Sequence, residues 1–134
     1  MDPKDIEVCN LLQYVIPEKI DIGHYETTGL GLILPNGLIM VNGSDSLEEQ
    51  VKTVLHEIIH MHPEFISYTK DLWKGSISRN DKYERRIEQS AQQVYVQRKD
   101  IVSLIIARLD EAYAHPLNSS LPKGRLSLTP SRRN

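Results

Sequence analysis

The stretch from Ser46 to Pro63 limits the possible folds more than any other part of the sequence, because it carries helix signals at both ends. Ser46 and Glu49 form a capping box, which marks the start of a helix. Pro63 disfavours helical backbone in the residue before it, so the helix should end near Met61 or His62. Between these ends, apolar residues recur at a spacing of three and four and predict one buried stripe: Val51, Val54, Leu55, Ile58 and Ile59.

The residues before this helix predict one further helix and a small antiparallel sheet. Asp2 as N-cap and Pro3 at the first helical position mark the start of a helix, and the spacing of the apolar residues that follow predicts that it runs to about Pro17. Weak alternation predicts a short strand within residues 19–28. Residues 30–34 and 38–41 are apolar runs on either side of a Pro-Asn-Gly turn, which predicts a hairpin with positive φ at the Asn-Gly pair.

The residues after the central helix predict C-terminal helices and a tail. Residues 63–79 show no clean period and are expected to form a loop with at most one helical turn. Residues 80–114 keep a helical period, as one long helix or as two with a break near Lys99 and Asp100. The Pro-, Ser- and Arg-rich end predicts a flexible tail over 117–134, after a single domain over 1–116. The fold class is therefore α+β.

The central helix contains the motif H-E-x-x-H at His56, Glu57 and His60. Imidazoles four residues apart lie on one face of a helix and can bind the same zinc ion. A glutamate beside them is suited to accept a proton from a water molecule whose pKa the ion lowers. We therefore predict His56 and His60 as metal ligands and Glu57 as the catalytic base. The competing interpretation is a helix with two solvated histidines.

A catalytic zinc normally has three protein ligands, so a third must come from elsewhere in the chain. His62 follows His60 too closely to share its face of the helix. Glu84 and Glu88 lie four residues apart on the next predicted helix, and Glu88 adjoins the apolar face formed by Ile87 and Ala91. We predict Glu88 as the third ligand, with Glu84 as the alternative. In the competing interpretation both carboxylates are exposed and pair with nearby arginines.

Composition excludes some classes of function. Sixteen Lys and Arg against eighteen Asp and Glu give a formal net charge of −2, so a basic surface for nucleic acid is not expected. No apolar run approaches the roughly 20 residues of a membrane-spanning helix. One cysteine and an N-terminus without a secretion-signal pattern favour a cytoplasmic protein.

The run LIMVNGSDSLEEQVKTVLHEIIHM, followed after a loop by ERRIEQSAQQVYV, resembles the ImmA/IrrE family of zinc metallopeptidases, which are small gluzincins. The family pattern of a glutamate three residues before an alanine falls on Glu88 and Ala91. The resemblance spans roughly residues 25–95. It implies a compact zincin-like domain that binds zinc through His56, His60 and Glu88. It also implies cleavage of a peptide or protein substrate, such as a helix-turn-helix repressor, with Glu57 as the base.

Two other functions fit the same sequence. One is a noncatalytic zinc-binding regulatory module that recognises a protein partner, and the other is a helical adaptor in which the histidines are incidental. For a peptidase, the hairpin offers a strand edge to an extended peptide. Three tyrosines are candidates for stabilising the oxyanion, and the sequence does not choose among them: Tyr68, Tyr83 and Tyr95.

Overall fold

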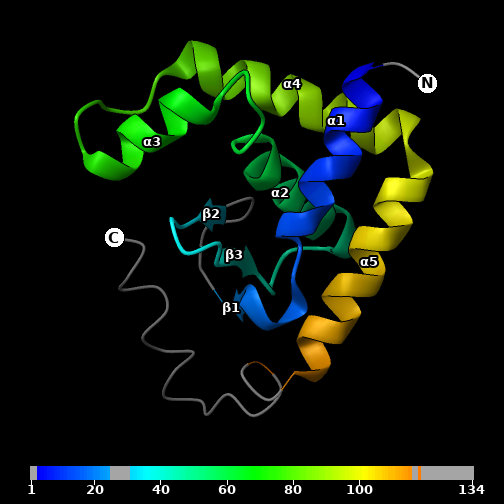
Figure 1. Cartoon of the computed structure of the whole chain (residues 1–134). Helices are drawn as coiled ribbons and strands as arrows, with labels where there is room; N and C mark the ends of the chain where they lie inside the picture. The colour runs from blue at the N-terminus through cyan, green and yellow to red at the C-terminus, as the bar shows by residue number, and fades with distance from the viewer. Residues whose placement is uncertain (1–2, 25–30, 116–117, 119–134) are drawn as a thin grey trace.

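The computed structural model describes residues 3–24, 31–115 and 118, and within them it has an α+β fold (Figure 1). This confirms the predicted fold class. The helices are α1 Pro3–Leu11, α2 Leu47–Ile59, α3 Ile66–Lys74, α4 Asp81–Gln97 and α5 Lys99–Ala114. The strands are β1 Ile20–Gly23, β2 Gly31–Ile33 and β3 Ile39–Asn42, and short 3-10 turns occupy Leu12–Tyr14 and Pro17–Lys19.

The sheet is mixed, not antiparallel as predicted. Its strand order is β1-β3-β2, with β2 antiparallel and β1 parallel to the central β3. All four residues of β3 are buried, which suits a strand that is paired on both edges. The predicted hairpin is correct for β2 and β3, and the prediction failed only for β1, whose partner is set by packing of the whole domain.

The hairpin turn differs from the predicted one. Gly37 has a φ of +88°. Among the described residues only glycines have a positive φ, so Asn36 does not share this conformation. Pro35 holds its own φ near −65°, which starts an ordinary turn and leaves the left-handed position to Gly37. The amide side chain of Asn36 instead accepts a hydrogen bond from the backbone N–H of Leu38 at 3.0 Å.

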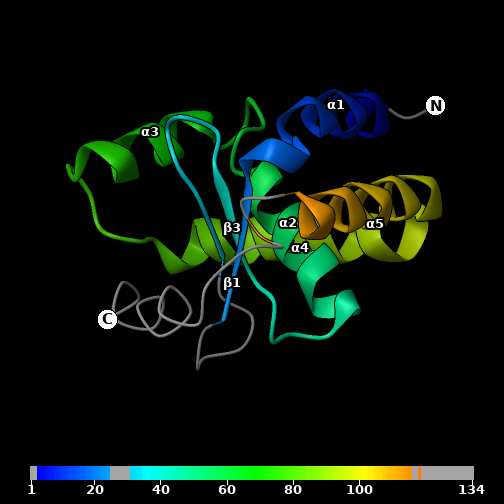
Figure 2. The same cartoon turned by 90° about the horizontal axis from the view of Figure 1, so that it is seen from below.

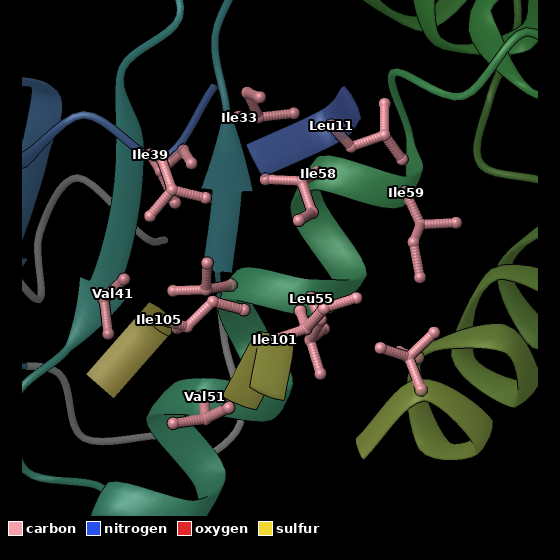
Figure 3. Packing of buried hydrophobic residues seen from close by; sticks show 14 of the residues in the cluster. Leu11, Ile33, Ile39, Val41, Val51, Leu55, Ile58, Ile59, Ile101 and Ile105 are labelled. Atoms are coloured by element: carbon pink, nitrogen blue, oxygen red, sulfur yellow. The ribbon is translucent and has the colours of Figure 1, made fainter. Parts of the chain in front are cut away.

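Helix α2 lies at the centre of the domain, with one side against the sheet (Figure 2). Ser46 is confirmed as its N-cap, because Oγ of Ser46 accepts a hydrogen bond from the N–H of Glu49 at 3.2 Å, which is one half of the predicted capping box. All five residues of the predicted stripe are buried. Figure 3 shows side chains of α2 packed between those of the sheet and those of α5. The central helix is thus fixed in position by apolar contacts on several sides.

Two helices differ from the prediction, and the C-terminal segment matches one of the two predicted alternatives. Helix α1 ends at Leu11 and passes into a 3-10 turn, and Ile16 before Pro17 is already extended. Residues 66–74, which were expected to be mainly loop, form α3, whose short buried face is built from polar and aromatic residues that give no apolar period. The C-terminal segment is two helices, with the break at Arg98.

Asn118 lies beyond the predicted domain boundary at residue 116, yet its side chain is buried against β1. Its Oδ1 accepts a hydrogen bond from the N–H of Ile22, and its Nδ2 donates to the carbonyl oxygens of Ile20 and Ala112. The domain therefore extends at least to Asn118. The rest of the predicted tail, 119–134, lies outside the described residues. None of the helices in the described part of the chain is long and apolar enough to span a membrane.

Candidate metal centre

The two histidines of the motif lie together at the C-terminal end of α2. Their ring centroids are 5.2 Å apart. One potential ligand atom from each of His56, Glu57 and His60 lies within 4.8 Å of the other two. Glu57 and His60 are buried, and His56 is partly exposed. The motif residues are therefore grouped as the helical spacing predicts.

Helix α4 brings both candidate glutamates to this group, and their carboxylates contact different ring nitrogens of His56. Oε1 of Glu84 is 3.2 Å from Nε2 of His56 and 3.4 Å from Nε2 of His60. Oε2 of Glu88 is 2.8 Å from Nδ1 of His56 on the other side of that ring. The side chain of Glu84 is 12% exposed and that of Glu88 is 47% exposed. Glu84, not Glu88, thus faces both imidazoles.

The tautomer of His60 follows from its contact with Thr69 of α3. The Thr69 hydroxyl donates its proton to the carbonyl oxygen of His60 at 2.7 Å or of Phe65 at 3.1 Å. It must therefore accept at its second contact, with Nδ1 of His60 at 3.0 Å. Nδ1 of His60 therefore carries a proton, and Nε2 is the nitrogen that faces Glu84.

His56 has a carboxylate at each ring nitrogen. Burial alone would lower the pKa of its imidazole, but the hydrogen bonds to Glu84 and Glu88 outweigh burial and raise the pKa from 6.5 to about 9. For Glu88, the hydrogen bond to His56 lowers the carboxyl pKa against the opposing effect of burial, so Glu88 is an acceptor and Nδ1 of His56 is its donor. Nε2 of His56, like Nε2 of His60, is left to face Oε1 of Glu84.

Glu84 is held in place by two further contacts. Tyr68 donates its hydroxyl to Oε2 at 2.5 Å, and Nη2 of Arg79 lies 2.8 Å from Oε1. Burial acts against ionisation of this carboxyl, but hydrogen bonds from His56, His60 and Tyr68 hold its pKa well below the usual 4.5. Glu84 is therefore a fixed anion at the point where the two histidines meet.

Glu57 is the carboxylate of the motif that lines a cavity. The cavity has a volume of about 210 Å³, and it is also lined by His56 and Gly31, by Arg79 and Glu88, and by residues of the preceding turns of α2. Burial raises the pKa of the Glu57 carboxyl, while the charges of His56 and His60 act in the opposite direction. A buried carboxyl with a raised pKa beside a cavity is suited to accept and release a proton.

The other histidines and tyrosines considered from the sequence lie outside this group. Nε2 of His62 is 2.6 Å from Oε2 of Glu7 in α1, and Nδ1 of His24 contacts Ser44. Tyr83 stacks on Tyr68, with ring centroids 4.7 Å apart, and does not line the cavity.

Sequence reasoning missed Thr69 and Arg79. Both lie in the segment that was expected to be a loop. The periodicity of apolar residues gave no signal for either of them.

Comparisons of the chain with protein-family models, with curated proteins and with solved structures find no match.

Proposed function

We propose that this protein is a zinc-dependent peptidase whose ion is held by His56, His60 and Glu84. The observation that carries this proposal is the convergence of two imidazole Nε2 atoms on one carboxylate oxygen, at 3.2 and 3.4 Å. Without a proton or a metal ion between them, each of these atoms would present a lone pair to the others. Their meeting point therefore requires positive charge, which a proton or a metal ion supplies.

The donor set fits zinc. Two neutral imidazoles and one carboxylate are a common ligand set of catalytic zinc sites, which leave a fourth position for water or substrate. The partners of the outer nitrogens also fit, because ligating histidines usually donate the other N–H to a carboxylate or another oxygen. Here Glu88 accepts from His56 and Thr69 accepts from His60.

This arrangement moves the proposed third ligand from Glu88 to Glu84, the alternative left open by the sequence. Glu88 lies at Nδ1 of His56, on the side of the ring away from His60, so it orients the ligand instead of completing the ligand set. The predicted roles of His56, His60 and Glu57 are unchanged.

The proposed reaction is hydrolysis of a peptide bond. A bound zinc ion supplies Lewis acidity and lowers the pKa of a water molecule. Glu57 accepts the proton of the attacking water and passes it to the nitrogen of the departing amine. Its burial beside the cavity keeps its basicity above that of an exposed glutamate and limits competition from bulk water.

An extended peptide is the proposed substrate because strand β2 presents an outer edge at the cavity. The N–H of Leu34 donates to the carbonyl of Leu38, and in an antiparallel pair the residues that bond to the partner strand alternate with residues that do not. The backbone groups of Gly31 and Ile33 therefore point away from β3. Trp73 donates to the carbonyl of Ile33 at 3.0 Å, and Gly31 lines the cavity. No described strand pairs with this edge. A peptide added there would lie beside Glu57.

Three parts of this proposal rest on the sequence: the relationship to the ImmA/IrrE family, a protein such as a repressor as substrate, and a cytoplasmic location.

The test is the variant Glu57→Gln, which keeps the shape of the side chain and removes the base. It should retain zinc and lower kcat by roughly 10²- to 10⁴-fold on peptides that the zinc-loaded wild type cleaves from a cell-derived peptide mixture. If the wild type binds zinc but neither protein cleaves any peptide, the noncatalytic zinc-binding module replaces the peptidase.

A further inference from the structure

We propose that Arg79 is the catalytic group that stabilises the negative charge on the oxygen of the scissile carbonyl. This inference rests on the proposed function and adds a residue to it. Arg79 belongs to the connection between α3 and α4, and its Nη2 lies 2.8 Å from Oε1 of Glu84. That oxygen is the one on which both imidazoles converge. The guanidinium is thus placed next to the reacting centre.

The backbone beside Arg79 is anchored. The N–H of Asn80 donates to the hydroxyl of Tyr68 at 3.0 Å, and Oδ1 of Asn80 accepts from the N–H groups of Lys82 and Tyr83 at the start of α4. The residue that follows Arg79 is therefore fixed both to α3 and to α4. This limits the reorganisation that the guanidinium needs when charge develops, which is the condition for effective electrostatic stabilisation.

Arg79 also has donors to spare. A guanidinium has five N–H donors, and the hydrogen bond to Glu84 occupies one of them. The side chain is 69% exposed and lines the same cavity as Glu57. Arg79 is therefore able to keep its bond to Glu84 while another N–H reaches a substrate oxygen in the cavity.

The other candidate donors are less suitable. Tyr68 already donates its hydroxyl to Glu84, and neither Tyr83 nor Tyr95 lines the cavity. Lys52 does line it, but its ammonium pairs with Glu48 at 3.2 Å and with Glu49 at 4.0 Å. Among the described residues that line the cavity, Arg79 is the cation placed at the Glu84 oxygen.

The chemical step balances with Arg79 in this role. The water oxygen forms a bond to the carbonyl carbon, Glu57 takes the water proton, and the π electron pair moves to the carbonyl oxygen. Arg79 donates a hydrogen bond to that oxygen as its charge grows. An electron pair of the oxyanion then re-forms the C=O bond while the C–N bond breaks. The C–N electron pair stays on nitrogen, and the proton held by Glu57 is transferred to that nitrogen.

The test uses the full chain loaded with zinc and a phosphoryl dipeptide, whose tetrahedral anionic phosphorus imitates the hydrated carbonyl. Arg79→Met should keep one zinc per chain and bind the phosphoryl dipeptide roughly 10- to 100-fold more weakly, because a charge-assisted hydrogen bond is lost. Arg79→Lys should recover part of this affinity. On a cleaved peptide, Arg79→Met should lower kcat by roughly 10²- to 10³-fold with a much smaller change in KM.

Arg86→Met is the matched control, because it removes the same charge from an exposed side chain near Glu84 in sequence that lines neither of the two cavities beside His56. It should bind the phosphoryl dipeptide as the wild type does. Equal affinity of Arg79→Met and wild type would overturn the role of Arg79 and leave the zinc site standing. A wild type that binds no zinc, or that binds the phosphoryl dipeptide equally well without zinc, would overturn both this role and the proposed function.

Discussion

Oγ1 of Thr69 accepts a hydrogen bond from Nδ1 of His60 at 3.0 Å, and this bond leaves Nε2 as the nitrogen that faces Glu84. The Thr69 hydroxyl donates its one proton to the carbonyl oxygen of His60, so Thr69 can only accept in its contact with Nδ1. A residue of α3 thereby sets the chemistry of a residue of α2. Contacts of this kind orient ligands in known metal sites and change their affinity when they are removed.

Thr69→Val tests this relationship because valine keeps the shape of threonine and lacks the hydroxyl. We expect zinc affinity to fall roughly 10- to 100-fold, since the ring of His60 loses its orienting acceptor. Thr69→Ser keeps the hydroxyl and should stay close to wild type. Competition with a chromophoric chelator measures both. A folded Thr69→Val protein with wild-type zinc affinity would show that His60 needs no such partner.

Gly31→Ala tests the close approach of β2 to α2 beside the site. A Cβ at this position would lie 2.3 Å from Cγ2 of Thr53 and 3.2 Å from the carbonyl oxygen of Met40. We expect the free energy of unfolding to fall by about 1–3 kcal/mol, the usual cost of overpacking, as measured by urea denaturation.

The double variant Gly31→Ala with Thr53→Ala supplies the control for this clash. Removing Cγ2 of Thr53 takes away the nearest obstacle, so the double variant should lose less stability than the sum of the two single variants. Simple additivity of the two losses would mean that the strand moves away from the helix without strain.

Asn118→Ala tests whether the domain includes this residue. The substitution leaves three backbone groups on Ile20, Ile22 and Ala112 without their side-chain partner. The carbonyl of Ala112 keeps a backbone hydrogen bond, so the carbonyl of Ile20 and the N–H of Ile22 are the groups left unpaired. We expect the free energy of unfolding to fall by about 3 kcal/mol, since each buried group left unpaired costs about 1–3 kcal/mol. Asn36→Ala removes an exposed bond to the backbone and should cost well under half as much. Equal small losses would place Asn118 outside the cooperative core.

The local parts of this fold were predictable from the sequence. Helix α2 is specified by its N-cap Ser46 and by its own apolar period, and both signals act within a few residues. Part of the buried face of α4 was also predicted, because Ile87 and Ala91 are both fully buried. Interactions within one helix therefore carried most of what the sequence revealed.

The glutamate that faces both imidazoles was not predictable in the same way. Glu84 and Glu88 lie one turn apart on the same side of α4, so the choice between them depends on how far α4 is shifted along α2. Packing of the whole domain sets that shift. The parallel pairing of β1 and the formation of α3 depend on long-range contacts as well, and α3 carries Thr69, which orients His60.

The most direct test of the central claim is the zinc content and affinity of the wild type beside Glu84→Gln and Glu88→Gln. We expect one zinc per wild-type chain, an affinity loss of more than roughly 100-fold for Glu84→Gln, and a smaller loss, within roughly 10- to 100-fold, for Glu88→Gln. Zinc that is absent from the wild type, or that is lost in Glu88→Gln and kept in Glu84→Gln, would contradict this account.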